Sequence, residues 1–150
     1  MRRKNKGFSL IELMIVVAII AILAMIMTPN LLTAIQKAKL KATMEDMRNV
    51  GMAVDSYMTD WGHAVEGGDL NTLNRYLNPF YTKRLARNDA WGRAYTYTAL
   101  ADEYSISSGG KDGVITMTNG TIYDPPTQLG DFARDLIYSS GAFTVAPRQH

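Results

Sequence analysis

The sequence predicts an α+β protein in which one long N-terminal helix packs against a small antiparallel β-sheet. Three observations lead to this prediction: an apolar run near the N-terminus, an amphipathic helical pattern that continues from it, and alternating strand patterns in the last third of the chain. The chain has 150 residues, of which 47% are hydrophobic and 20% are charged. This balance is typical of a globular protein and not of a disordered one.

The composition removes several kinds of chemistry. The chain has no cysteine, which excludes disulfides, cysteine-ligated zinc, iron–sulfur clusters and thiol nucleophiles. Its only histidines are His63 and His150, and nothing in the sequence brings a serine to His63. The pair Gly109-Gly110 lacks the context of a phosphate-binding loop. We therefore expect that the protein is not an enzyme.

The first element is a basic N-terminus followed by an apolar helix. The formal net charge is +2, but four of the 16 basic residues lie within residues 1–7, where there is no acid. Residues 8–27 are apolar except for Ser9 and Glu12, and a helix of this length spans roughly 30 Å, the thickness of a bilayer core. The positive-inside rule then predicts a single pass with a cytoplasmic N-terminus.

Glu12 distinguishes this segment from a simple anchor or a secretory signal peptide. The apolar run exceeds the ~7–15 residues of a signal-peptide core, and no small-x-small cleavage site follows it. A carboxylate inside the span costs about 2.5–3.5 kcal/mol, so Glu12 is a functional candidate. Cleavage between Gly7 and Phe8 would create an amino group that could pair with Glu12, from the same chain or from a neighbouring copy. Such a pair would select the register of assembly, because an unpaired charge is costly.

The segment Gly7-Phe8-Ser9-Leu10-Ile11-Glu12-Leu13, with the long apolar helix behind it, resembles the signal of type IV pilins and type II secretion pseudopilins. The resemblance implies cleavage after Gly7 by the prepilin peptidase and N-methylation of Phe8. It implies that Glu12 pairs with the Phe8 amine of an adjacent subunit. Pro29 matches the helix-interrupting proline of the family, where we expect local kinking or melting. Residues 1–7 are then the leader, and residues 8–29 are the transmembrane and filament-core helix.

The same helix continues over residues 30–62 as an amphipathic half. The whole helix, from Phe8 to its end, is then about 80 Å long. Gly62 is the expected stop. Lys37, Lys39 and Lys41 are expected on a solvated face, toward anionic lipid or acidic neighbours in a filament. The apolar face recurs in steps of three and four at Leu40, Met44, Met47, Gly51, Val54, Met58 and Trp61.

Residues 63–150 form the C-terminal α+β region. Asp69 is expected to cap a short helix over residues 70–77, which Pro79 prevents from continuing. Alternating patterns predict strands at residues 95–98, 104–107 and 114–118, and a late hairpin at residues 136–138 and 142–145 around Ser139-Ser140-Gly141.

Residues 89–97 and 104–113 resemble the major, G-type pseudopilin of type II secretion, whose pattern begins Asp-Pro-Trp-Gly; here Ala90 replaces the proline. The resemblance implies a type IV pilin-like fold and a subunit that polymerises into a helical pseudopilus. Two alternatives remain at this stage: a type IV pilin for adhesion or motility, and a membrane-anchored periplasmic binding module that does not polymerise.

The resemblance also implies partners, a location and a candidate metal. The partners are copies of this chain, the prepilin peptidase, minor pilins or pseudopilins and the inner-membrane assembly platform. The location is the bacterial inner membrane and then a periplasmic or cell-surface filament. Nucleic acid is not expected, because the only dense basic run is the leader.

That family often carries a structural calcium ion, but no cofactor is required by this sequence. The candidate ligands for calcium are Asp112, Asp131 and Asp135, with Asp124 as a further carboxylate. The family's glycine-rich acidic loop is replaced here by residues 119–126, and no EF-hand spacing is present. Solvated loop acids and caps are the alternative interpretation of these residues.

Overall fold

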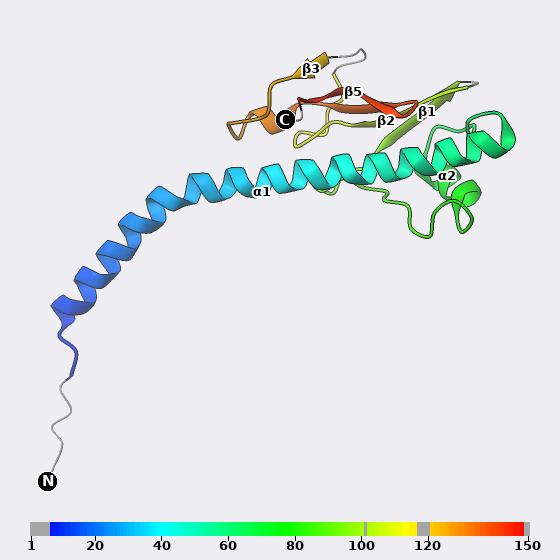
Figure 1. The fold of residues 1–150 in the computed structure, drawn as a ribbon. Coiled ribbons are helices and arrows are strands. Elements are labelled where there is room, and N and C mark those ends of the chain that lie inside the picture. Colours follow the sequence, from blue (N-terminus) through cyan, green and yellow to red (C-terminus); the bar gives the residue numbers. More distant parts are fainter. Residues whose placement is uncertain (1–6, 101, 117–120, 149–150) are drawn as a thin grey trace, which may run out of the picture.

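The computed structural model describes residues 7–100, 102–116 and 121–148, and it has the predicted α+β architecture. One long helix extends beyond the globular domain, and the sheet lies along its C-terminal half (Figure 1). The elements are α1 (Leu10–Trp61), α2 (Leu70–Leu77), β1 (Thr96–Leu100), β2 (Glu103–Ser108), β3 (Thr121–Tyr123), η1 (Asp131–Ala133), β4 (Leu136–Ser139) and β5 (Ala142–Pro147).

Helix α1 is continuous over 52 residues. It begins at Leu10, two residues later than expected, because Ser9 has extended backbone angles and precedes the first turn. It ends where the sequence indicated: Gly62 takes a left-handed conformation (φ 75°), and its N–H donates to the Met58 carbonyl at 2.8 Å. Glycine adopts this conformation without the Cβ clash of other residues, which explains the stop.

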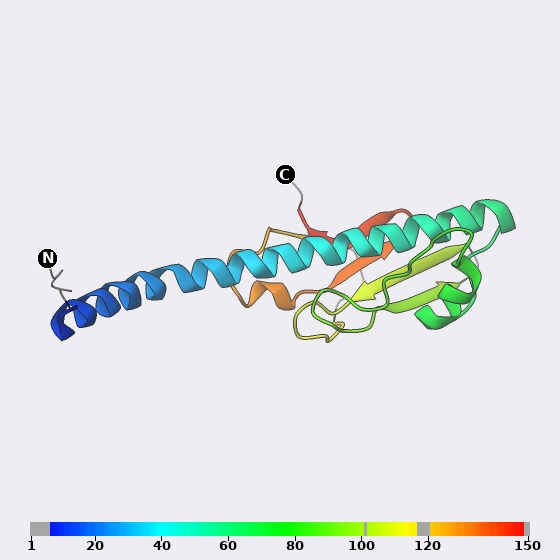
Figure 2. The same cartoon turned by 90° about the horizontal axis from the view of Figure 1, so that it is seen from below.

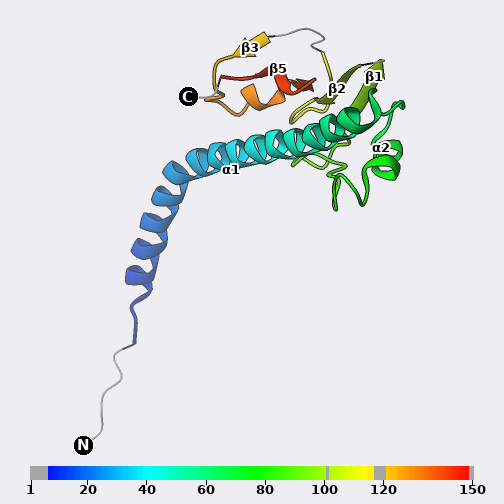
Figure 3. The same ribbon diagram turned by 45° about the vertical axis from the view of Figure 1, so that its right-hand side comes forward.

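Pro29 lies inside α1, and the chain remains helical through it. The helix changes direction between its blue N-terminal part and its cyan part (Figures 1 and 3). Proline removes one helical N–H and crowds the preceding turn. Next to it, the Thr28 hydroxyl donates to the Ala24 carbonyl at 2.6 Å, a bond that also favours bending. Of the two expected outcomes, the structure has the bend and not the melting.

The five strands form one sheet in the order β1-β2-β4-β5-β3. The β1–β2, β2–β4 and β4–β5 pairs are antiparallel, whereas β3 lies parallel to β5 at the edge. The sheet is therefore mixed, and its antiparallel part matches the prediction. The late hairpin is confirmed: Ser140 (φ 43°) and Gly141 (φ 90°) make the tight turn between β4 and β5.

The third predicted strand, over residues 114–118, is wrong at residues 114–116, which form no strand; residues 117 and 118 lie outside the described residues. Side chains take the backbone donors there. Asp112 accepts from the Val114 N–H at 3.0 Å, and Asp135 accepts from the Thr116 N–H at 2.7 Å and from its hydroxyl at 3.1 Å. At Thr116 a carboxylate therefore replaces a neighbouring strand as acceptor, and the described strand β3 covers Thr121–Tyr123.

The core lies between the C-terminal half of α1 and the sheet, with α2 at the far end (Figure 2). The helix α2 is capped as predicted, because the Asp69 carboxylate accepts from the Thr72 N–H at 2.8 Å. The buried face of α1 is broader than the predicted apolar face, since the sheet and the loop before β1 cover it from two sides. Its buried residues are Leu40, Thr43, Met44, Met47, Val50, Gly51, Ala53, Val54 and Tyr57.

Trp61, the last residue of the predicted apolar face, is 63% exposed. It lies in the final turn of α1, beyond the strands, where little of the domain remains to cover it. Its place on the apolar face of the helix therefore does not bring it into the core.

Candidate processing and assembly site

The predicted cleavage point lies in an exposed segment just before α1. Gly7 has no atom near its Cα on the side where a Cβ would be, and the Phe8 side chain is 77% exposed. Both residues precede the first helical residue, Leu10. The peptide bond between them is thus open to an enzyme that binds extended chain. The other leader residues, 1–6, lie outside the described residues.

Glu12 lies in the first turn of α1, and its carboxylate faces the start of the helix. Its Oε2 atom accepts from the Ser9 backbone N–H at 2.9 Å. A helix N-terminus presents unpaired N–H groups and a partial positive charge, both of which favour a carboxylate. In the uncut chain the nitrogen of Phe8 is an amide, so the helix terminus supplies the partner. The carboxylate therefore already lies where cleavage would create an amine, one residue before Ser9.

The helix around Glu12 exposes its apolar side chains on every side. An 18-residue window of α1 has a mean hydropathy of 3.0, and none of it is buried within the chain. Among the described residues, α1 is the one helix long and apolar enough to cross a membrane. A continuous apolar surface of this size requires a cover, which is lipid or other apolar helices.

The turn Asp89-Ala90-Trp91-Gly92 forms the second part of the site, because it attaches the domain to α1. Asp89 is buried, and its carboxylate accepts from the Trp91 N–H at 2.9 Å, the Arg93 N–H at 2.9 Å and the Ser108 hydroxyl at 2.8 Å. Three donors satisfy a buried carboxylate and fix the shape of the turn. The sequence pattern indicated this segment, but not that Asp89 organises it.

Two bonds join this turn to α1 beyond the apolar run. The Trp91 indole N–H donates to the Gln36 side-chain oxygen at 2.7 Å, and the Ala90 N–H donates to the Thr43 hydroxyl at 3.1 Å. Proline has no N–H, so the second bond exists only because Ala90 stands where the family pattern has proline. Neither Gln36 nor Thr43 was identified from the sequence, because a lone polar residue on a helix gives no signal of a partner dozens of residues away.

The calcium candidates are engaged as caps. Asp131 accepts from the Thr127 and Gln128 N–H groups at 3.0 Å, and these donors, Gln128 first, hold the pKa of its carboxyl below the usual range. Asp112 and Asp135 bind the segment at residues 114–116, as described above. In the part of the chain that the structure describes, no three acidic or histidine side chains gather to hold a metal ion. The carboxylates of Asp112, Asp131 and Asp135 are thus each bound to backbone N–H groups of nearby loops.

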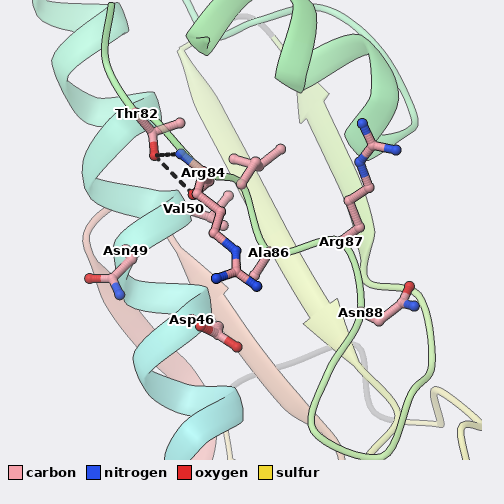
Figure 4. Close-up of a pocket in the computed structure, with 9 residues that line it drawn as sticks. Asp46, Asn49, Val50, Thr82, Arg84, Ala86, Arg87 and Asn88 are labelled. Carbon is pink, nitrogen blue, oxygen red and sulfur yellow. Dashed lines mark hydrogen bonds between the residues drawn. The ribbon is translucent and has the colours of Figure 1, made fainter. Parts of the chain in front are cut away.

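A polar groove of about 650 Å³ runs between α1 and the loop at residues 82–88 (Figure 4). Arg84 extends from the loop toward α1, on the side where Asp46 lies. Burial raises the pKa of the Asp46 carboxyl, the neighbouring Glu45 adds to the rise, and Arg84 opposes it. The groove contains charged and amide side chains, but it has no nucleophile paired with a base.

Two family models match the chain. Residues 2–28 match the prokaryotic N-terminal methylation motif, and residues 30–120 match type II secretion system protein G. The first match covers the processing segment and the apolar helix. The second covers the amphipathic half of α1, α2, β1, β2 and the Asp89 turn. Together they include both parts of the site described above.

Curated relatives agree with this assignment. The chain is 31% identical to the type II secretion system core protein G of Pseudomonas aeruginosa, over 75% of this chain and 89% of that protein. It is 33% identical to the same protein of Vibrio cholerae, over 74% of this chain and 86% of that protein. It is also 64% identical to the type IV wide pilus major component of Thermus thermophilus, but over only 24% of this chain and 28% of that protein.

No solved structure matches the chain significantly. The family therefore rests on the sequence comparisons, and the fold agrees with it through the long helix packed on a five-stranded sheet. The chain belongs to the type II secretion system protein G family, the major pseudopilins, whose subunits assemble into the pseudopilus.

Proposed function

We propose that this pseudopilin, before assembly, is a single-pass protein of the inner membrane. Its N-terminus lies in the cytoplasm and its C-terminal domain lies in the periplasm. The exposed apolar part of α1, which contains no ionisable side chain except Glu12, carries this proposal. Its basic flank lies N-terminal to the span, which keeps that end on the cytoplasmic side.

Processing then creates the assembly contact. The prepilin peptidase cuts the exposed bond after Gly7, and methylation of the new amine leaves it cationic. In the membrane a Glu12 carboxylate without a countercharge is costly, and a cationic Phe8 amine of an adjacent copy offsets that cost. The carboxylate faces the helix start, within reach of a partner that arrives at that end. The pairing selects one register between neighbouring helices.

Polymerisation follows from repeating this contact. The amine of one copy meets the carboxylate of another, so the two contact surfaces differ. A heterologous contact that does not close yields an open helix and not a ring. The apolar helices replace their contacts with lipid by contacts with one another, so their apolar surfaces are covered both in the membrane and in the filament. Minor pseudopilins and the inner-membrane assembly platform are the further partners we propose.

The role is mechanical and not catalytic in this proposal. The relatives are structural pseudopilins. The polar groups of the site, Asp89 and Thr43, are occupied by hydrogen bonds that hold the domain on α1. We further propose that the domain folds without a metal ion, because its candidate carboxylates serve as caps for backbone N–H groups.

The test compares Glu12→Ala with Ser9→Ala in cells that contain the secretion machinery. Both variants should reach the membrane fraction and begin at Phe8 by mass spectrometry of the N-terminus. Glu12→Ala should form no sheared filaments, whereas Ser9→Ala should form them, because only the first removes the carboxylate.

Three results would contradict the proposal. Recovery of chains that still begin at Met1 would show that the chain is not cleaved after Gly7. If Glu12→Ala formed as many filaments as the unaltered chain, the pairing of Glu12 with Phe8 would not be needed for assembly. Another contact would then have to set the register between neighbouring helices. Membrane insertion without any filament from the unaltered chain would instead favour a non-polymerising binding module.

A further inference from the structure

A groove with a basic rim lies at the end of the globular domain nearest the apolar helix. It has a volume of about 660 Å³ and runs between α1 and the segments that follow β3 and end β5. Four cationic side chains line it, from Lys37, Lys41, Arg48 and Arg148, with Glu45 as the one acid among the lining residues. A groove with this excess of positive charge fits an acidic partner.

The floor of the groove is apolar and rigid. Leu40 and Met44 line it from α1, and three prolines, at positions 125, 126 and 147, form the opposite wall. The chain beside them is held by the Arg148 N–H, which donates to the Tyr123 carbonyl at 2.7 Å. Proline and methionine surfaces pack well against aromatic rings. The expected occupant therefore combines an aromatic side chain with flanking carboxylates.

The opposite end of the same domain carries these groups. Residues 49–74 contain four acids and neither lysine nor arginine, and residues 94–110 contain two acids and again neither. The end of α1 and the ends of β1 and β2 at Leu100 and Glu103 lie at the same end of the domain (Figure 1). We call the exposed residues of this end the distal surface: Asp60, Trp61, Glu66, Asp102 and Glu103.

Trp61 is exposed but fixed in place. Its indole N–H donates to the Tyr81 hydroxyl at 3.1 Å, and that hydroxyl donates to the Asp60 carboxylate at 2.8 Å. The Tyr57 ring is stacked on it, with ring centroids 6.0 Å apart. A large aromatic side chain that is ordered before contact loses little entropy on binding, which is typical of the central residue of an interface.

We propose that the distal surface of one subunit docks into the basic groove of another copy in the pseudopilus. Trp61 packs on Met44 and the prolines, and the carboxylates around it face Lys37, Lys41 and Arg148. A second copy is the occupant because a filament contact is heterologous and needs two different, complementary surfaces on each chain. This chain carries both, at opposite ends of one domain. The inference rests on the filament assembly of the family.

The geometry also indicates which copies meet. Met44 and Trp61 are 17 positions apart, about 26 Å along α1. The pairing of Phe8 and Glu12 displaces neighbouring copies by four positions, about 6 Å. The groove contact therefore joins copies that are several steps apart along the assembly. The groove contact joins the outer domains of these copies, whereas the N-terminal helices select the register between adjacent copies.

Cysteine cross-linking tests this contact, because the chain has no native cysteine. The full-length chain carries Lys41→Cys together with either Glu66→Cys or Asp102→Cys, and all three positions are exposed. It is expressed with its secretion machinery, and sheared filaments are treated with a short bifunctional maleimide. We expect a ladder of dimers and higher multimers from at least one pair. The control pair is Lys41→Cys with the exposed Lys83→Cys, which should give no ladder.

Charge reversal gives an independent readout. Lys37→Glu with Lys41→Glu should reduce filament yield at least tenfold, and adding Glu66→Lys with Asp102→Lys should restore most of it. The filament yield should not be restored if the lysines only stabilise the fold of the domain. It should also not be restored if the groove binds anionic lipid instead of another copy.

The outcomes separate this inference from the proposed function. Filaments that form normally but give no ladder from either cysteine pair overturn the groove contact and leave assembly through Glu12 intact. A ladder of equal strength from cells without the assembly machinery also overturns it, since the contact would then belong to unassembled chains. Loss of all filaments in Glu12→Ala, with a ladder in the double-cysteine chain, supports both.

Discussion

The indole N–H of Trp91 donates a 2.7 Å hydrogen bond to the side-chain oxygen of Gln36, across 55 positions of sequence. Gln36 is half-buried and lies on α1 just beyond the apolar run, so this bond holds the Asp89 turn against the emerging helix. The position of the globular domain relative to the apolar part of α1 depends on such contacts, because α1 continues from one part into the other.

Removing this bond should destabilise the domain. We expect Trp91→Phe and Gln36→Ala each to lower the free energy of unfolding by about 1 kcal/mol, as for one lost hydrogen bond with its packing. The double variant should cost little more than either single one, because both remove the same bond. Thermal unfolding of the full chain in detergent measures this, and fully additive losses would show that the two side chains act separately.

Gly51 on α1 faces the ring of Tyr138 on β4. A Cβ at position 51 would overlap that ring, which is buried and cannot move aside easily. We expect Gly51→Ala to destabilise the domain by about 1–3 kcal/mol, despite the better helix propensity of alanine. The adjacent Met52 is exposed, so Met52→Ala is the control and should change stability by less than about 0.5 kcal/mol. Equal effects of the two variants would contradict this packing.

The domain should lose stability at alkaline pH. Burial raises the pKa of both Tyr97 and Tyr123 from 10.0 to about 12. Above pH 10 the unfolded chain releases these protons while the folded chain keeps them, so the stability present below pH 10 falls as pH rises toward 12. Chemical unfolding at a series of pH values should show this decline, and Tyr97→Phe should make it shallower. An unchanged slope in that variant would count against the role of burial.

Pro29→Ala should straighten and stabilise the bent part of α1. Alanine restores an N–H for the Met25 carbonyl and removes the ring clash, a change worth up to about 3 kcal/mol in a helix interior. Amide exchange at residues 24–33 should slow in the full-length chain in detergent. Exchange in the Glu45–Val50 segment, packed on the sheet, is the internal control and should not change. Unaltered exchange at residues 24–33 would show that the bend has another cause.

Calcium should have no effect on stability. Asp112 and Asp131 accept hydrogen bonds from backbone N–H groups, and no three acidic or histidine side chains gather among the described residues. We therefore expect the same melting temperature in millimolar calcium and in excess chelator. Magnesium at the same concentration controls for ionic strength. A specific rise of several degrees with calcium would show that the region of residues 112–135 holds the ion.

Local pattern was sufficient for the elements that depend on nearby residues. The span of α1, its stop at Gly62, the Asp69 cap and the hairpin around Ser140 and Gly141 all follow from helical period, apolar length or turn chemistry. Each of these is decided within a few positions of the chain. The family signal at residues 7–13 is equally local, and the N-terminal methylation motif that residues 2–28 match includes it.

The contacts that join distant segments were not predictable in this way. The parallel position of β3, the non-strand conformation of residues 114–116 and the exposure of Trp61 depend on which distant groups supply acceptors or cover. Asp135 replaces a strand partner for Thr116, and Thr43 and Gln36 acquire roles only when the Asp89 turn reaches them.

The sequence by itself thus determined the long helix, its membrane-length apolar part and the carboxylate of Glu12 within it, because each is a property of neighbouring residues. Only the tertiary structure decided how the domain is fastened to α1 and which surfaces remain for other copies. Burial and hydrogen bonding between segments dozens of residues apart depend on how the whole chain packs, and a local sequence pattern does not predict that packing.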